Sequence, residues 1–358
     1  MLGELAVLYL FLGGTGAACL GVCCLIDLVQ LRRSFGVAAR ELGTLAASEC
    51  RVVAAAFLAG FLMLAFGVLC LLFDLGKGDR ALDMLVSVFA SGTVNLMTAG
   101  VYGLVVLGAL GAAAVAAHWL YLPWLPAGAV HAVEAAVVPV ALFVMAYTGF
   151  LLQTLGGFSL WKNPLIPVLF TLSSASCGIA VVLACCVLFG GSSAAPSYRR
   201  VLLRVDGAVV LAEAVAAAVF LVQLSGSDHA ATHAAFENLT AGDQAFPWWC
   251  GFVGCAVLAP LLVQLALGAA GLAGRLRNPS RGMLGTPAPE TVSMGVPASA
   301  IASLSTADHH GSFGILSTLV VAALVLTGGL CLRVAVVDAA EQPQLELQES
   351  PTLEGAPL

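Results

Sequence analysis

Charged side chains are scarce in this sequence of 358 residues. They make up 9% of the chain, whereas hydrophobic residues make up 60%, and the mean hydropathy is +1.02. An average soluble domain carries about a quarter charged residues, so water cannot solvate this surface and a soluble enzyme is excluded. Disorder over most of the chain is excluded too, since it requires the opposite composition. The remaining class is a polytopic membrane protein, whose first partner is the lipid bilayer.

A basic surface is also missing. The formal net charge is −6, from 14 Lys and Arg against 20 Asp and Glu, and no basic patch stands out. Proteins that bind nucleic acids neutralise phosphate groups with clustered Lys and Arg. The composition therefore excludes a nucleic-acid partner.

The chain lacks the cysteine and histidine patterns that hold redox groups. None of its 11 cysteines forms a CxxC pair or an iron–sulfur spacing, so they are interpreted as small apolar packing residues. None of its six histidines is expected deep within an apolar stretch, which disfavours axial ligation of a haem. His229 and His233 are four residues apart and could share a helix face as metal ligands, but no third ligand stands nearby at motif spacing. We expect no haem, iron–sulfur cluster or metal in this chain.

Long apolar stretches dominate what is present. A helix needs about 20 apolar residues to cross the hydrocarbon layer, and eight stretches qualify. The runs are continuous rather than alternating, which favours helices over a β-barrel, and their frequent Gly and Ala residues allow close helix packing in lipid. The sequence therefore predicts an all-α, polytopic integral membrane protein with eight transmembrane helices, at about residues 5–27, 52–73, 96–118, 128–152, 164–190, 201–223, 250–273 and 313–337.

The distribution of Lys and Arg predicts the orientation. The connections after the first, third, fifth and seventh spans carry ten of these cations, and the other side carries four, Lys77, Arg80, Lys162 and Arg333. Because cationic loops stay in the cytoplasm, we expect a multi-pass protein of the cell membrane with both termini outside. The five tryptophans are expected in an interfacial belt. The absence of a basic segment before the first span argues against a cleaved signal peptide.

Two segments differ in composition from the bundle. Residues 1–337 form the predicted eight-helix transmembrane domain, which includes a loop at 274–312 that is rich in Pro, Ser and Gly and typical of a flexible segment. Residues 338–358 are acidic and contain proline, and they predict a disordered tail. Both segments lie outside the stretches expected to cross the membrane.

Acidic residues within the spans are candidates for function, because charges in lipid are costly. Glu213 lies near the middle of the sixth span, and Asp206 lies seven residues earlier on the same helix face, about 10 Å away along the axis. Glu134 lies in the inner half of the fourth span, and Asp27 closes the first span on the inner side. These acids form a series by depth that is compatible with a proton relay. The alternative is that each is a buried group bonded to a neighbouring helix.

Five motifs follow one another along the first 223 residues. They are Tyr9–Gly14 (YLFLGG), Phe73–Gly76 (FDLG), Tyr147–Leu152 (YTGFLL), Leu160–Phe170 (LWKNPLIPVLF) followed by Ser173 and Ser174, and Arg204 with Asp206 and Glu213. In this order and with eight spans, the chain resembles the NrfD/PsrC family, the membrane subunits of polysulfide-reductase-like complexes. The long seventh connection and the acidic tail exceed the compact pattern of that family.

The resemblance implies a role in quinol-linked electron transfer. Members of the family have no redox cofactor of their own, bind a quinol within the bundle near the outer face, and pass its electrons to a docked iron–sulfur subunit of the four-cluster ferredoxin type. A molybdopterin subunit usually completes the complex, and some members couple electron transfer to proton movement. By this resemblance the chain is a membrane-anchor subunit between the menaquinone or ubiquinone pool and an extracytoplasmic iron–sulfur protein, and it is not a complete enzyme alone.

The resemblance places the quinol ring near Tyr147, whose phenolic O–H can donate to a quinone carbonyl group. The alternative interpretation of Tyr147 is an interfacial tyrosine at the outer end of the fourth span. Asp74 closes the second span on the outer side and is suited to accept released protons, or else it pairs with neighbouring cations. On the first span Tyr9, Thr15 and Gly14 are the candidates for further ring contacts, and the alternative for Gly14 is close helix packing.

Two other functions remain open at this point. A secondary transporter would use the same buried carboxyl groups to move a solute or ions, and such proteins often contain inverted repeats and helices broken by Gly or Pro near the midplane. The sequence has no clear internal repeat, and Pro139 is the only proline expected deep within a span. A purely structural anchor would need neither a buried Glu213 nor a tyrosine at a ring site.

Overall fold

The computed structural model describes eight segments of the chain, and the regular structure in them is helical. These segments are residues 3–31, 44–74, 96–119, 126–154, 160–190, 198–227, 230–266 and 316–339. The predicted loop at 274–312 and residues 340–358 of the predicted tail lie outside the described residues, so the flexible loop and the disordered tail stay predictions.

Eight helices within the described segments are long and apolar enough to cross a membrane, which confirms the all-α, eight-span prediction. The first six spans are α1 (Glu4–Ile26, continued by a π-helical turn at Asp27–Leu31), α2 (Thr44–Asp74), α4 (Leu96–Trp119), α5 (Ala127–Thr154), α6 (Leu165–Phe189) and α7 (Arg199–Ser225). The seventh span is Pro247–Ala266, which is π-helical over Pro247–Leu258, and the eighth is Leu316–Ala339. A 3₁₀ turn at Leu160–Lys162 and the short helix α8 (Ala230–Thr240) lie between spans.

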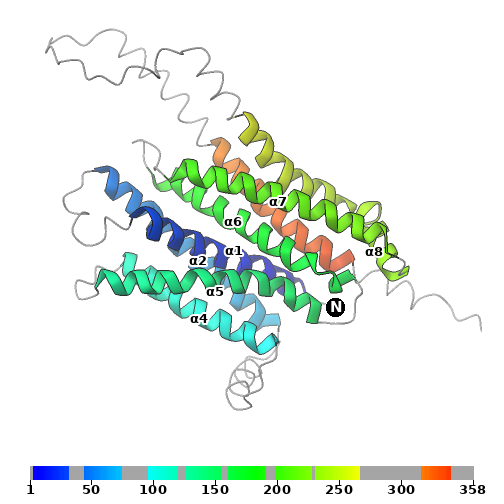
Figure 1. The fold of residues 1–358 in the computed structure, drawn as a ribbon, viewed down its shortest axis with the longest axis horizontal. Helices are drawn as coiled ribbons and strands as arrows, with labels where there is room; N and C mark the ends of the chain where they lie inside the picture. Colours follow the sequence, from blue (N-terminus) through cyan, green and yellow to red (C-terminus); the bar gives the residue numbers. More distant parts are fainter. Residues whose placement is uncertain are drawn as a thin grey trace, which may run out of the picture.

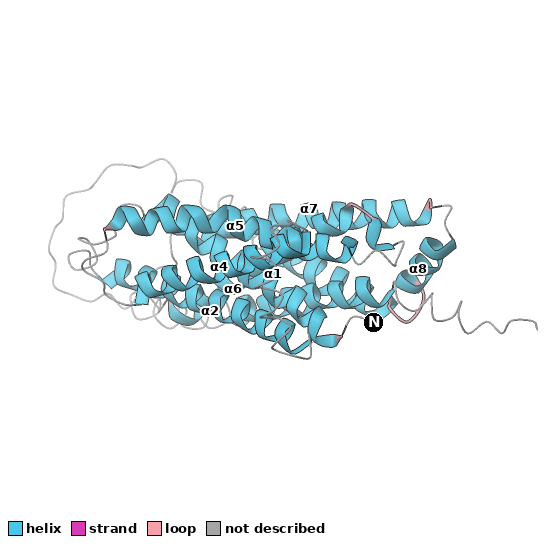
Figure 2. Cartoon of the chain, turned by 90° about the horizontal axis from the view of Figure 1, so that it is seen from below, coloured by secondary structure: helices cyan, strands magenta, loops and turns pink. Residues whose placement is uncertain are grey.

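The spans form an elongated bundle with α1 and α6 in its interior (Figure 1). α1 packs against α2, α5 and α6, while α6 also packs against α7. α4 packs against α2 and α5 on one side of the bundle, and α7 and the seventh span lie on the other side. Figure 2 shows α8 at the same end of the bundle as the N-terminus. A continuous apolar core joins these helices, and large apolar side chains on α2, α4 and α7 face outward, as lipid contact requires.

Glycines explain how α1 reaches the interior. A Cβ atom at Gly16 of α1 would lie 2.5 Å from the backbone nitrogen of Leu64 in α2, and one at Gly178 of α6 would lie 2.6 Å from Cβ of Ala18. No real Cβ atom fits at such distances, so the two neighbouring helices approach α1 backbone to backbone. Small residues at helix contacts are the usual way in which helices pack in lipid.

The two ends of the bundle are distinguished by one acid each. At the Asp74 end α2 and α5 finish and α1 begins, and Asp74 lies against Gly3. At the Asp27 end α1 and α4 finish and α5 begins, and Asp27 lies near His118 of α4. By the cation distribution, the Asp74 end is the one predicted to face outward.

The interfacial tryptophan belt predicted from the sequence is wrong for two of its members. Trp161 is 2% exposed and donates a hydrogen bond from Nε1 to the carbonyl oxygen of Val336 (3.2 Å), and Trp248 is fully buried. These rings fill space between helices instead of facing the interface. Trp119 and Trp249, at 56% and 45% exposure, are placed as a belt requires. The fifth tryptophan lies outside the described residues.

The position predicted for Arg333 is also wrong. The sequence count assigned Arg333 to an outer connection, but its side chain is fully buried within the eighth span. The span continues beyond Arg333 to Ala339, so this arginine lies within the bundle and not in a connection. Without Arg333 the outer connections carry three cations against ten on the other side, and the asymmetry that predicts the orientation becomes larger.

Candidate functional site

The described structure gathers the predicted site residues into three groups. A pair of buried tyrosines lies toward the Asp74 end, a group around a buried arginine lies in the middle, and acids with histidines meet at the Asp27 end. α1 contributes side chains or backbone groups to all three, because it is the span with the most buried length.

The tyrosine pair consists of Tyr9 on α1 and Tyr147 on α5. The two side chains are 1% and 4% exposed and lie close enough to interact electrostatically. The Tyr147 ring packs directly on Gly100 of α4, where an added Cβ atom would overlap the ring. It also stacks with Phe143, with 6.2 Å between ring centroids and 24° between ring planes. Tyr147 therefore faces the interior, and it is not a tyrosine of the lipid interface.

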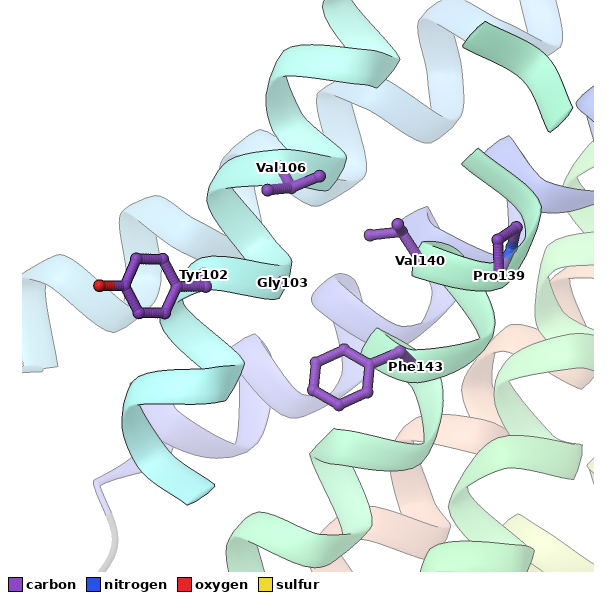
Figure 3. Close-up of a pocket in the computed structure, with 6 residues that line it drawn as sticks. All are labelled: Tyr102, Gly103, Val106, Pro139, Val140 and Phe143. Carbon is purple, nitrogen blue, oxygen red and sulfur yellow. The ribbon is translucent and has the colours of Figure 1, made fainter. Parts of the chain in front are cut away.

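An apolar groove of about 280 Å³ opens between α4 and α5 beside this pair (Figure 3). Phe143 lines the groove and also stacks with Tyr147, so the groove and the buried ring share a neighbouring side chain. Val106 and Phe143 are 44% and 41% exposed, which places the mouth of the groove on the lipid-facing surface. The lining residues are Tyr102, Gly103 and Val106 of α4 and Pro139, Val140 and Phe143 of α5.

Pro139 and Gly103 give local reasons for the groove. Pro139 stands inside α5 and has no backbone N–H, so one helix hydrogen bond is missing there. Gly103 has no side chain, and a Cβ atom in its place would lie 2.7 Å from Cε1 of Phe143. Gly103 therefore lets the Phe143 ring lie close against α4 at one side of the groove.

Asp74 lies at the surface of the same end of the bundle. It is the last residue of α2, is exposed, and contacts Gly3, which directly precedes α1. Six residues of helix separate Gly3 from Tyr9, which corresponds to about 9 Å along the axis. The cations Lys77 and Arg80, which the sequence suggested as partners of Asp74, lie outside the described residues.

The middle group is organised by Arg333 of the eighth span. Its guanidinium group donates from Nε to the carbonyl oxygen of Leu10 (3.2 Å) and from Nη2 to Oγ of Ser174 (2.7 Å). Nη1 donates to the carbonyl oxygen of Gly329 (2.5 Å) and to Oγ of Ser173 (3.3 Å). One fully buried cation thus joins α1, α6 and the eighth span.

Glu213 of α7 is the acid of this group. It is fully buried and lies near the Arg333 guanidinium group and the Ser173 hydroxyl, while neither of its carboxyl oxygens has a hydrogen-bond partner among the described residues. The guanidinium carbon also lies 5.4 Å and 5.2 Å from the ring centroids of Phe11 and Phe170. A buried charge is tolerated when an opposite charge and polar groups replace water, and aromatic faces add a further attraction.

Gly14 and Thr15 belong to the middle group and not to the tyrosine pair. A Cβ atom at Gly14 would lie 2.5 Å from Oγ of Ser174 and 3.5 Å from Nη2 of Arg333. The close contact at Gly14 is therefore explained by helix packing, which was the alternative interpretation of this residue. Thr15 is fully buried beside Cys177 of α6.

Asp206 has the partners expected of a structural carboxyl group. It accepts hydrogen bonds from Oγ of Ser176 (3.2 Å) and from Nε2 of Gln264 (3.0 Å), which tie α7 to α6 and to the seventh span. It also interacts electrostatically with Glu213, its neighbour on the same helix. Asp206 and Glu213 are therefore two buried acids on one side of α7, two helical turns apart.

The Asp27 end brings together Asp27, His118, His131 and Glu134. Nε2 of His118 lies 3.8 Å from Oδ2 of Asp27 and 3.6 Å from Oε1 of Glu134, and Nδ1 of His131 lies 3.5 Å from Oε2 of Glu134. Both acids are fully buried. His118 lies in the last turn of α4 beside the third connection, and its side chain is 5% exposed, so it is buried and not solvated.

The acids occupy two groups at different depths of the bundle, and the proton relay that the sequence suggested through them stays a prediction. Asp27 and Glu134 lie against each other between α1, α4 and α5, whereas Asp206 and Glu213 face α6 and the last two spans. Within the described residues no hydrogen bond or ion pair joins the two groups.

Three residues of these groups were not predicted. A lone arginine in an apolar run is a signal for a buried charge with polar partners on other helices, and this signal was present in the sequence at Arg333. His118 stands at the end of its span, where sequence cannot separate a buried side chain from a solvated one. The sequence could not identify Gly100 as a site residue, because its role depends on the Tyr147 ring that packs on it from another helix.

Comparison with known proteins agrees with the motifs. The family described as "Polysulphide reductase, NrfD" matches residues 2–275, beyond the 223 residues that carry the motifs. Similar proteins include Protein NrfD of Escherichia coli, 30% identical over 131 residues (37% of this chain and 41% of that protein), and the C subunit of the polysulfide reductase of Wolinella succinogenes, 32% identical over 127 residues (36% and 40%). A Haemophilus influenzae NrfD homolog is 27% identical over 133 residues (36% and 41%). The matched segment spans about two fifths of the length of each relative.

Proposed function

Because this chain belongs to the polysulphide reductase NrfD family, we propose that it is the membrane subunit of an oxidoreductase complex and exchanges electrons with the quinone pool. The observation that carries the proposal is the buried Tyr147 beside a groove that opens to lipid. A quinol arrives from the lipid phase, so its site needs an apolar entrance and a few polar groups that orient the ring.

The groove between α4 and α5 is the proposed entrance for the ring. Its volume of about 280 Å³ is close to the lower bound of small-molecule sites, about 300 Å³, so it suits a quinone head group whose isoprenoid tail stays in lipid. Rotation of Phe143 would open the way to Tyr147. The Tyr147 hydroxyl then donates to a ring oxygen, and Tyr9 supplies a second hydroxyl on the far side.

Oxidation of a quinol also releases two protons. Asp74 is the proposed acceptor at the surface, because it lies exposed at the end of the bundle that carries the tyrosine pair. Glu213 and Asp206 are the carboxyl groups proposed for any proton movement through the interior, since they are neighbours on one helix and are buried. Glu134 lies apart from both routes.

The Asp74 end is the proposed docking end for an iron–sulfur subunit of the four-cluster ferredoxin type, with a molybdopterin subunit beyond it. A ring beside Tyr147 is nearer to this end than to the other, which shortens the path for electrons. The excess of cations in the opposite connections supports an outward-facing Asp74 end in the cell membrane. One matched relative is named as a lettered component of a polysulfide reductase, which supports a multi-subunit complex.

Quinol binding by the full chain in lipid nanodiscs tests the proposal. Titration with a short-chain menaquinol analogue, followed by quenching of tryptophan fluorescence, is expected to saturate for the unaltered protein. Tyr147→Phe removes one hydrogen bond to the ring and is expected to weaken binding by up to about tenfold. Tyr198→Phe is the matched control, because Tyr198 is equally buried but directly precedes α7 at the Asp27 end. Equal affinity of the unaltered protein and Tyr147→Phe would contradict the ring site.

A further inference from the structure

The group at the Asp27 end is absent from the quinol proposal, yet it is the densest cluster of ligand-type side chains in the described chain. One ligand atom each from Asp27, His131 and Glu134 lies within 4.8 Å of the others. His118 lies beside this group as a candidate fourth ligand, since its Nε2 is 3.6 Å from Glu134 and 3.8 Å from Asp27, but it is not part of the set in which every pair of ligand atoms lies within 4.8 Å. These side chains come from the end of α1, the end of α4 and the beginning of α5.

The separations between these atoms suit ligands around a common ion. A charge-assisted hydrogen bond joins nitrogen and oxygen at about 2.7–2.9 Å, and the three imidazole–carboxylate distances of 3.5, 3.6 and 3.8 Å are longer. Four ligands at about 2.0–2.1 Å from a tetrahedral metal ion lie about 3.3 Å from one another. The three imidazole–carboxylate pairs therefore need shifts of a few tenths of an ångström to reach ligand spacing, and the wider separations of the group, up to 4.8 Å, need larger ones.

His118 is held in the orientation of a metal ligand. Its Nδ1 lies 2.8 Å from the carbonyl oxygen of Ala114, which can only accept, so Nδ1 carries a proton and Nε2 points to the carboxylates. The ring also packs against Phe57, with 4.4 Å between ring centroids. Metal-bound histidines usually donate their second N–H to a carbonyl or carboxylate oxygen in this way.

The charges of the group also call for a cation. Asp27 and Glu134 are fully buried, and within the described chain neither accepts a hydrogen bond from a backbone amide or hydroxyl group and neither pairs with Lys or Arg. They lie close enough to each other to share a proton, which would cancel only one charge. Asp206, by contrast, is satisfied by two hydrogen-bond donors. Two adjacent carboxylates buried in this way are costly unless a cation, either a metal ion or a protonated imidazole of His118 or His131, lies beside them.

We propose that Asp27, His118, His131 and Glu134 bind one divalent transition-metal ion, for which zinc(II) is the best match. Two imidazole nitrogens and two carboxylate oxygens from the protein complete a tetrahedral zinc shell, so the site is structural and holds α1, α4 and α5 together at this end. No local sequence motif marks it, because its ligands come from three helices. The site does not depend on the proposed quinol function.

Metal titration of the full chain tests the site, with a streptavidin-binding tag in place of polyhistidine. After removal of metals by a chelator, cobalt(II) is expected to bind one per chain and to give the visible absorption bands of a tetrahedral complex. Glu134→Gln and His131→Ala are each expected to weaken binding at least about tenfold. His233→Ala is the matched control, because His233 forms an exposed pair with Glu237 (3.5 Å) and should leave binding unchanged.

X-ray absorption of the zinc-loaded, unaltered protein avoids any folding defect of the variants. The expected spectrum has a first shell at about 2.0–2.1 Å with the outer-shell scattering of imidazole rings. A shell of oxygen atoms alone would overturn the proposal. So would the absence of saturable cobalt binding below about 1 mM, or binding that His233→Ala abolishes and Glu134→Gln retains.

Discussion

Arg333 is a single residue on which the middle of the bundle depends. Its guanidinium group makes four hydrogen bonds to three helices and faces Glu213. In lipid no water can enter to replace these contacts. Loss of the arginine would leave both a buried carboxyl group and backbone carbonyl groups without their donor.

Replacing Arg333 by Gln is therefore expected to lower the free energy of unfolding by about 3–5 kcal/mol, because two backbone carbonyl groups and two serine hydroxyls lose a charged donor and the nearby buried Glu213 loses its cation. Reversible unfolding in mixed micelles would measure it. The control is Arg204→Gln, because Arg204 is exposed on α7 and its loss should change stability by less than about 0.5 kcal/mol. Equal stability of the two variants would show that the buried Arg333 does not hold the bundle together.

Gly100 offers a test of the tyrosine pair without changing a tyrosine. Gly100→Ala places a methyl group in the Tyr147 ring, so the ring must move and affinity for the quinol analogue should fall. Gly108→Ala on the same helix is the control, since no atom lies within 4 Å of its added Cβ. If both variants bind the analogue equally, the position of Tyr147 does not determine ring binding.

The sequence predicted single residues better than their partners. It identified Glu213 and Asp206 as buried, and they are. It did not pair Glu213 with Arg333 or Glu134 with His118, because each partner stands on another span and the packing of spans is not encoded in local spacing. Hydropathy also favoured a loop position for Arg333, since a charge at the end of an apolar run marks a span end more often than an interior contact.

Among the helices, α1 differs from the other spans in how closely its neighbours approach. Gly16→Ala places a methyl group against the backbone of Leu64 and is expected to cost about 1–3 kcal/mol in unfolding free energy. Gly128→Ala, at an open position near the start of α5, should be neutral or slightly stabilising because Ala favours helix. Thermal unfolding followed by size-exclusion chromatography would separate them, and equal midpoints would argue against backbone contact between α1 and α2.

The eight spans were predictable and their arrangement was not. Length and apolar character set the positions of the helices, and the seventh begins at Pro247 where the sequence predicted about residue 250. The buried position of α1 depends on Gly16, Gly60 and Gly178, whose contacts lie on other helices. The predicted interfacial positions of Trp161 and Trp248 were wrong for the same reason. Composition cannot distinguish an aromatic side chain packed between helices from one at the lipid surface.

At the scale of the whole molecule, the orientation in the membrane determines which end of the bundle can bind a redox partner. With ten cations in one set of connections and three in the other, alkaline phosphatase inserted after Gly226 is expected to be active outside the cytoplasm. Green fluorescent protein inserted after Gly190, at the opposite end, is expected to fluoresce. The reverse pattern would place the Asp74 end in the cytoplasm and would move the proposed docking surface with it.

The proposed function depends on a quinol ring that reaches Tyr147 through the groove between α4 and α5. Photolabelling of the full chain with an azido-quinone, followed by mass spectrometry, would locate the ring. We expect labels on Tyr102, Phe143 or Tyr147 that an excess of unmodified quinol removes, and we expect Gly100→Ala to reduce them. Labelling confined to the Asp27 end, or labelling that quinol does not compete away, would refute this ring site and would favour a transporter or a simple anchor.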